Sequence, residues 1–268
     1  MRKRTLLSAL GFAVSIAIIL LALYFTDLNK TIEILSKANE YLVLVAITSL
    51  TTFVAKGFRW HLMLKHSETR SSLKESFYSF FAGSLFSTFT PGRIGEPIRS
   101  YFLKKMNGAS MSKTLSLILL ERIIDLMVLS FLSLAAIYFL SSETAGFKGI
   151  GLIAIALISA IIVLLFLVAY EKTGKKIVGF ASRFVKQLGS INFELFYSAL
   201  SKFRRKRRLL LYLLLTLFVW AAEGAVFYFS LLSVNTTLPL FVAISLTGLA
   251  FIVGIVSFLP GGLGSSEA

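Results

Sequence analysis

The chain is dominated by long apolar runs separated by short charged connections. A helix needs about 20 apolar residues to cross the roughly 30 Å hydrocarbon layer of a bilayer. Runs of this kind predict membrane-spanning helices over residues 5–25, 41–64, 113–140, 149–170, 209–234 and 238–259. A shorter apolar segment, 76–90, falls between the second and third of them. We therefore predict an all-α, polytopic membrane helix bundle that forms a single domain over 1–268.

Positive charge predicts how this bundle is oriented. The basic sequence MRKR at 1–4 precedes an apolar run that is longer than a signal-peptide core and has no small-residue cleavage site after it. We expect a retained first span in the cell (inner or plasma) membrane, with the N-terminus in the cytoplasm. The Lys- and Arg-rich loop 171–208, which includes RRKRR at 204–208, predicts an amphipathic helix on the anionic inner leaflet.

The segment 76–90 is too short for a comfortable crossing and ends at a proline. Basic residues lie on both sides of it, so a crossing would place the second basic group outside, against the positive-inside tendency. A re-entrant hairpin that enters and leaves on the cytoplasmic side fits these charges better. Non-helical backbone is tolerated at membrane depth only where protein or a water-filled cavity shields it. The corner that follows, 91–96, should therefore face the protein interior.

Acidic residues occur inside two of the predicted spans, where each charge is costly unless it is paired. In the sequence ERIID, Asp125 lies four residues after Glu121 and three after Arg122, so the three side chains share one helix face. They either lock helices together through an Arg122–Asp125 pair or form a headgroup or ion site. Glu223, among small residues that allow another helix to approach closely, is expected to be protonated or paired with an arginine such as Arg93 or Arg122.

The span 41–64 ends in a basic, aromatic sequence in which Lys56 and Arg59 are three residues apart and Trp60 follows. We interpret these as basic side chains that extend to the interface beside an interfacial tryptophan. The alternative is that Lys56 lies deep enough to face a polar cavity.

Two segments repeat one motif. FTPGRIGE at 89–96 and FLPGGLGSSE at 258–267 both place Phe-x-Pro-Gly-x-x-Gly after an apolar segment and before a glutamate. Counting spans puts their entries on opposite faces, which is typical of an inverted repeat with a midplane binding site. The prolines and glycines that are expected to shape the backbone of the two motifs are Pro91, Gly92, Gly95, Pro260, Gly261, Gly262 and Gly264. A second re-entrant segment needs a returning arm, so we expect the chain to be truncated at its C-terminus.

The predicted site carries both charge signs and suits a lipid headgroup. The arginines available for an anionic group are Arg93, Arg99 and Arg122. The carboxylates available for a cationic group are Glu96, Glu121, Asp125, Glu223 and Glu267.

Composition narrows the chemistry. The mean hydropathy of +0.82 shows that the net charge of +15 belongs to a membrane protein, for which basic loops explain it better than nucleic-acid binding does. With no cysteine and only two histidines, disulfides, thiolate or His-rich metal sites and Cys nucleophiles are excluded. We predict no catalytic residue, no metal and no cofactor, and we predict membrane lipids as partners.

Four motifs also resemble one family: KGFRWHLML, GRIGEPIR, ERIID and PGGLGSSE, in this order. The chain resembles the transmembrane region of lysylphosphatidylglycerol synthases, a flippase-like group that is also called UPF0104. The resemblance implies a polytopic inner-membrane domain, and in the multiple peptide resistance factors such a domain moves aminoacylated phosphatidylglycerol between leaflets. The resemblance also implies that the charged residues and the glycines of the three later motifs belong to the site described above.

We accordingly expect translocation or binding of a lipid with a charged headgroup, of phospholipid or polyprenyl-phosphate type, by alternating access. One alternative is the membrane component of a lipid-linked aminoacyl or glycosyl transferase, which would need a separate transferase partner. The other is a non-catalytic membrane scaffold whose charges only hold helices together.

Overall fold

The computed structural model is entirely helical over the part of the chain that it describes. It describes residues 39–88, 90, 95–143, 170–182, 192–203 and 205–256, with single positions at 32, 36, 159, 163 and 167. The helices are α3 Tyr41–His66, α4 Leu73–Thr88, α5 Ile98–Asn107, α6 Met111–Glu143, α8 Glu171–Ser182, α9 Phe193–Ser201, α10 Lys206–Ser233 and α11 Leu240–Val256. The predicted span 5–25, nearly all of 149–170 and the second Pro-Gly motif lie outside the described residues.

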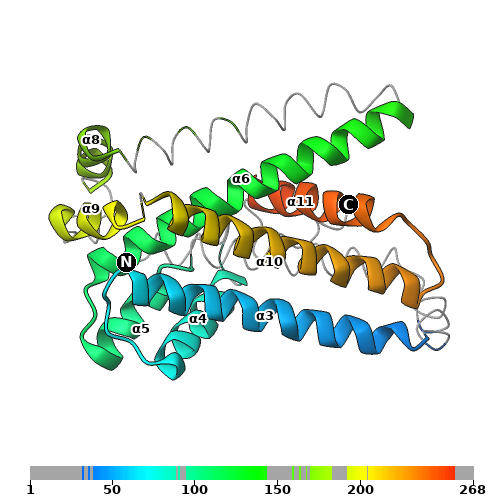
Figure 1. Cartoon of the computed structure of the whole chain (residues 1–268), viewed down its shortest axis with the longest axis horizontal. Helices are drawn as coiled ribbons and strands as arrows, with labels where there is room; N and C mark the ends of the chain where they lie inside the picture. The colour runs from blue at the N-terminus through cyan, green and yellow to red at the C-terminus, as the bar shows by residue number, and fades with distance from the viewer. Residues whose placement is uncertain are drawn as a thin grey trace, which may run out of the picture.

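Four long helices, α3, α6, α10 and α11, run side by side, while α4, α5, α8 and α9 gather toward one end of the bundle (Figure 1). Helices α3 and α10 are antiparallel. Before the start of α3, the Asn39 side-chain amide donates to the carbonyl of Leu232 at 3.2 Å. At the other end, His66 Nδ1 lies 2.6 Å from the hydroxyl of Tyr212.

The outer faces of α3 and α10 are apolar. Both helices are long and apolar enough to cross a membrane. Their exposed side chains include Ile47 and Leu50 on α3 and Leu214 and Phe218 on α10, and Leu50 keeps 65% of its surface accessible. Contiguous apolar surface of this kind is unfavourable in water and suits contact with lipid. The two helices are therefore the clearest membrane-span candidates in the described chain.

Glycines allow α11 to pack closely on two neighbours. A Cβ on Gly224 of α10 would lie 2.5 Å from the Cα of Ile244, and one on Gly248 of α11 would lie 2.7 Å from the Cβ of Leu132. Only glycine fits at such separations, which is how small residues bring helices together in membranes. The prediction that small residues beside Glu223 allow close helix approach is confirmed at Gly224.

Helices α4 and α5 form a hairpin that returns to its starting side. At its open end, Ser72 and Glu75 form a capping box, because the Ser72 amide donates to Glu75 Oε2 at 2.8 Å and the Glu75 amide donates to Ser72 Oγ at 3.2 Å. Asn107, the last residue of α5, donates to the same Glu75 oxygen at 3.1 Å. At the closed end, the amide of Gly95 donates to Thr90 Oγ1 at 2.8 Å. The entry of this hairpin into the membrane stays a prediction.

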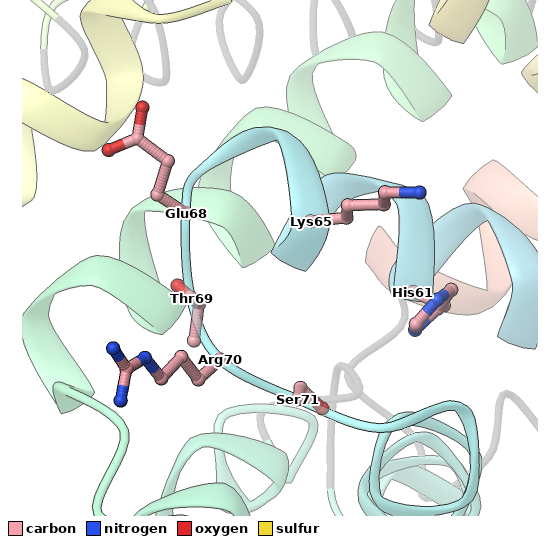
Figure 2. A pocket seen from close by; sticks show the side chains of 6 residues that line it. All are labelled: His61, Lys65, Glu68, Thr69, Arg70 and Ser71. Atoms are coloured by element: carbon pink, nitrogen blue, oxygen red, sulfur yellow. The ribbon is translucent and has the colours of Figure 1, made fainter.

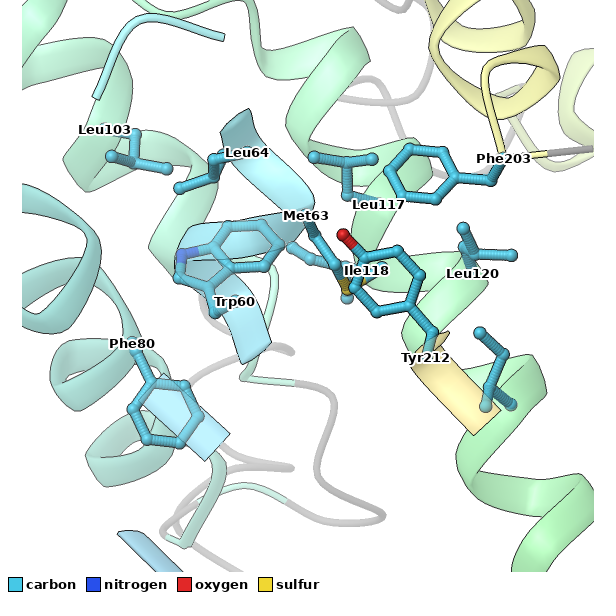
Figure 3. Packing of buried hydrophobic residues seen from close by; sticks show 11 residues of the cluster. Trp60, Met63, Leu64, Phe80, Leu103, Leu117, Ile118, Leu120, Phe203 and Tyr212 are labelled. Carbon is cyan, nitrogen blue, oxygen red and sulfur yellow. The ribbon is translucent and has the colours of Figure 1, made fainter. Parts of the chain in front are cut away.

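An apolar cluster joins α3, α6, α10 and the α4–α5 hairpin (Figure 3). It contains Trp60 and Leu64 from α3, Leu117 from α6 and Tyr212 from α10, all fully buried. The indole nitrogen of Trp60 donates to Ser79 Oγ on α4 at 3.1 Å, so the ring is fixed in position and orientation. This packing holds the charged residue that precedes Trp60 inside the bundle.

Candidate functional site

Arg59 of α3 lies at the centre of a charged network. Its side chain is 3% exposed, and its Nη1 donates to Asp125 Oδ1 at 2.7 Å and to Thr216 Oγ1 at 2.6 Å. Its Nη2 donates to Glu121 Oε1 at 2.7 Å and to Asp125 Oδ2 at 3.2 Å. A buried guanidinium needs such partners because an unpaired charge in an apolar interior is strongly unfavourable. Arg59 thus ties α3 to α6 and α10.

Arg99 of α5 is the second buried arginine of the network. Its Nη2 donates to Glu121 Oε2, so the two oxygens of one carboxylate bind two different arginines. Its guanidinium carbon also lies 4.0 Å from the centroid of the Trp60 ring, a cation–π contact. These contacts fix the α4–α5 hairpin to α6 and α3.

Arg122 of α6 faces outward from this centre and is 26% exposed. Its Nη2 binds Asp125 Oδ2 at 2.8 Å, which confirms the predicted pair. Its Nε lies 3.2 Å from Glu96 Oε2, but neither of these two atoms makes a hydrogen bond. The Arg122–Glu96 contact is therefore an ion pair in which one N–H donor is left without an acceptor.

A second pair adjoins the network. Lys56 Nζ, one turn before Arg59 on α3, lies 2.7 Å from Glu223 Oε2 on α10, and the two side chains are 22% and 36% exposed. The ring of Trp220 connects the two parts, because its Nε1 donates to Asp125 Oδ1 at 3.3 Å and Lys56 Nζ lies 5.5 Å from its centroid.

The charges form two groups that differ in exposure. We call the residues whose side chains are almost completely buried the buried frame: Arg59, Arg99, Glu121 and Asp125. We call the partly exposed residues the rim: Lys56, Glu96, Arg122 and Glu223. Each group contains two cations and two anions, so each is neutral when all are ionised. The frame can hold helices in place, and the rim is where an outside charge can enter.

The structure brings together five of the residues that the sequence predicts for the site: Glu96, Arg99, Glu121, Arg122 and Asp125. Arg93, Glu267, Pro91, Gly92 and the glycines of the second motif lie outside the described residues. Among the described residues, no group of three His, Asp or Glu side chains is arranged to hold a metal ion.

Two expectations are wrong. Arg59 does not extend to the interface, because Glu121, Asp125 and Thr216 bind its two terminal nitrogens inside the bundle. In the described part of the chain, which does not include Arg93, Glu223 pairs with Lys56 across the α3–α10 contact and not with Arg122. The sequence contained a signal for the inward position of Arg59. ERIID carries two carboxylates for one arginine, so a further cation had to come from another helix.

Comparison with known proteins identifies the family. The profile of the lysylphosphatidylglycerol synthase transmembrane region matches residues 8–268. A UPF0104 membrane protein of Pyrococcus horikoshii is 28% identical, covering 99% of this chain and 84% of the relative. One from Methanocaldococcus jannaschii is 23% identical, covering 99% and 82%. No solved structure matches the chain significantly.

Proposed function

The chain belongs to the family of the lysylphosphatidylglycerol synthase transmembrane region, and we propose that it binds the charged headgroup of a membrane lipid at the rim and moves it between leaflets. The observation that carries this proposal is the state of Arg122. This arginine is partly exposed, is fixed at one edge by Asp125, and has an Nε–H donor without an acceptor.

A phosphate group matches this arrangement. The planar guanidinium fork binds phosphate oxygens through paired N–H donors, and bonds between charged groups are stronger than neutral ones. A phosphate can take the place of the Glu96 carboxylate, which Arg122 contacts at 3.2 Å without a hydrogen bond. In such an exchange Arg122 keeps an anionic partner throughout, so its cation is not left uncompensated while the headgroup enters.

The Lys56–Glu223 pair provides the complementary half of the site. Glu223 is the most exposed carboxylate of the rim, and an incoming ammonium group can replace Lys56 there. Both exchanges take place beside the buried frame, whose contacts stay intact. A headgroup that carries a phosphate and an amine can thus place its phosphate at Arg122 and its ammonium at Glu223. Because the two groups have opposite charges, the net charge of the bundle is preserved.

Membrane placement and the transport cycle form part of the same proposal. The end of the bundle that carries α4, α5, α8 and α9 would face the cytoplasm, with the basic residues of 171–208 on the anionic leaflet. The corner at Gly95 and the second Pro-Gly motif would then alternate in exposing the rim to the two leaflets.

A leaflet-exchange assay tests this function. The protein is reconstituted into vesicles that contain phosphatidylglycerol or phosphatidylethanolamine with a fluorescent acyl chain, and a membrane-impermeant reductant quenches the outer leaflet. We expect Arg122→Gln and Glu96→Gln to slow exchange at least tenfold while insertion stays normal. Lys104→Gln is the matched control, because Lys104 is an exposed residue of α5 outside the network. Exchange at the wild-type rate in both rim variants would refute the proposal.

One observation favours a scaffold function instead: the charges of the network cancel, as they would in a purely structural lock. The Lys56–Glu223 pair separates the two functions, because its charges can be reversed without changing a residue of the buried frame, at the cost of the Lys56–Trp220 contact. A scaffold tolerates Lys56→Glu combined with Glu223→Lys, since the ion pair is preserved. A headgroup site should lose activity, because the ammonium-binding carboxylate has moved to another helix.

A further inference from the structure

A second polar pocket lies where α3 ends, away from the charged network. Its volume is about 520 Å³, and it is lined by His61, Lys65, Glu68, Thr69, Arg70 and Ser71 (Figure 2). All six residues come from the last turns of α3 and the connection to α4. None belongs to the buried frame or the rim, so the pocket is a separate site.

The pocket has an excess of positive charge. Lys65 and Arg70 form no ion pair with any carboxylate in the described part of the chain. The only acidic lining residue, Glu68, binds Lys202 Nζ at 2.5 Å, and its side chain points away from Lys65 and His61 (Figure 2). Lys202 thus neutralises Glu68, and two free cations remain to attract an anion.

The end of a helix normally disfavours an anion, because its last carbonyl groups carry partial negative charge. Here backbone amides of the connection to α4 donate hydrogen bonds to these carbonyl groups. The amides of Ser67, Glu68 and Thr69 donate to the carbonyls of Met63, Lys65 and Leu64 at 3.0, 3.1 and 3.0 Å, respectively. The bonds from Glu68 and Thr69 form a Schellman motif.

Glu68 occupies the left-handed position of this motif with a φ of 58°. Glycine is the usual residue at such a position, because it has no side chain to cause strain there. A glutamate in its place is unfavourable for the backbone. What it adds is a carboxylate that holds Lys202 of the connection between α9 and α10. The backbone strain is thus kept at the edge of the pocket, where it positions the lining.

The pocket also offers polar groups that suit phosphate oxygens. His61 Nδ1 lies 2.9 Å from Ser76 Oγ, and this contact fixes the ring on the side of the α4 helix. Ser71 Oγ lies 2.9 Å from the same hydroxyl. In the described part of the chain, Nε2 of His61 makes no hydrogen bond. A ring nitrogen, a hydroxyl and two cations therefore line this pocket, with the side chains of Lys65 and Arg70 extending in opposite directions (Figure 2).

We propose that this pocket binds the phosphate group of a membrane phospholipid. The pocket opens at the end of α3, a helix long and apolar enough to cross the bilayer, which places it at headgroup depth. The neighbouring start of α10 carries exposed basic residues, as expected at an anionic membrane surface. The pocket would hold one lipid at the periphery of the protein, and this inference does not depend on transport between leaflets.

The test measures binding to the purified full-length protein in a neutral detergent. The probe is a short-chain phosphatidylglycerol kept in monomeric form, titrated against the protein by calorimetry. A second titration uses glycerol 3-phosphate, a soluble phosphate monoester without acyl chains. We expect Lys65→Gln with Arg70→Gln to weaken lipid binding at least tenfold and glycerol 3-phosphate to bind at least tenfold more weakly than the lipid.

The matched control is Lys104→Gln with Lys105→Gln, which removes the same charge from exposed positions outside the pocket. It should change binding less than twofold. Glu68→Gly retains the left-handed backbone and frees Lys202, so it should preserve or strengthen binding. Equal weakening in the pocket and control variants, or no weakening in either, would overturn the proposal. Equal affinity for glycerol 3-phosphate would overturn the lipid assignment in favour of a soluble phosphate ester.

Discussion

Replacing Arg59 by methionine is expected to destabilise the bundle strongly. The substitution preserves most of the apolar volume of the side chain but removes a 3% exposed cation that binds Glu121, Asp125 and Thr216. Removing one partner of a buried ion pair costs about 3–5 kcal/mol, because the other charge stays buried without compensation. Asp125 retains Arg122 and Trp220 here. We therefore expect a loss near the lower end, about 3 kcal/mol.

Lys56→Met is the matched control, since it removes the same charge from the same helix one turn earlier. Both members of the Lys56–Glu223 pair are partly exposed, so the cost should stay below about 1 kcal/mol. The assay is equilibrium unfolding of the detergent-solubilised protein by an increasing fraction of denaturing detergent, followed by helical circular dichroism. Equal losses for the two variants would refute the assignment of Arg59 to a buried frame.

A second substitution distinguishes loss of charge pairing from loss of packing as the cause of the destabilisation by Arg59→Met. In Arg59→Met, the buried frame carries one excess negative charge, so adding Asp125→Asn should restore part of the stability. The asparagine removes that charge, and its side-chain oxygen can still accept from Trp220. Arg99 keeps Glu121 as its ionic partner, and Arg122 keeps Glu96. A double variant that is less stable than Arg59→Met alone would show that packing, and not charge, explains the loss.

Two further substitutions test other parts of the account. Gly224→Ala should already disrupt the α10–α11 contact and lower the melting temperature, because a Cβ at this position meets the Cα of Ile244 at 2.5 Å. Gly224→Val should lower it further, because it adds two methyl groups at the same place. Glu75→Gln should cost about 0.3–1 kcal/mol at neutral pH, since it keeps an acceptor for the Ser72 amide but removes the negative charge at the start of α4. The Ser72 amide holds the pKa of Glu75 below its ordinary value of 4.5, so this contribution is complete above pH 4.5 and is lost as the pH falls through the lowered pKa. Unfolding of the wild-type and Glu75→Gln proteins at pH 3 to 7 should therefore converge at the acidic end.

Much of the architecture could be predicted from hydrophobic patterning. The runs 41–64, 113–140 and 209–234 correspond to α3, α6 and α10, since a continuous apolar stretch leaves few alternatives to a helix. The Arg122–Asp125 pair was also predictable, because three residues of separation bring two side chains together on any helix. Both features depend on local sequence alone.

The rest of the network depends on contacts between distant segments. Arg59 and Glu121 are 62 residues apart, and Lys56 and Glu223 are 167 apart. Nothing in the local pattern distinguishes an arginine that extends to the interface from one that turns inward to a carboxylate. That choice is made by packing: Trp60 is fixed against Ser79, and this places the preceding residue toward α6. Charge balance within ERIID was the one sequence signal for a missing cation.

The central claim is that a lipid phosphate contacts the rim while the buried frame stays closed. Solid-state NMR tests it directly in reconstituted protein, by measuring the dipolar coupling between arginine side-chain ¹³Cζ and lipid ³¹P. The account predicts a resolved guanidinium–phosphate cross-peak of Arg122 that is lost in Arg122→Lys, while the couplings of Arg70 and of the arginines in the basic loop 171–208 remain. The contact of Arg59 with Asp125 should persist in the same sample. A coupling that is unchanged in Arg122→Lys, or no coupling at all in a protein that exchanges lipid, would contradict it.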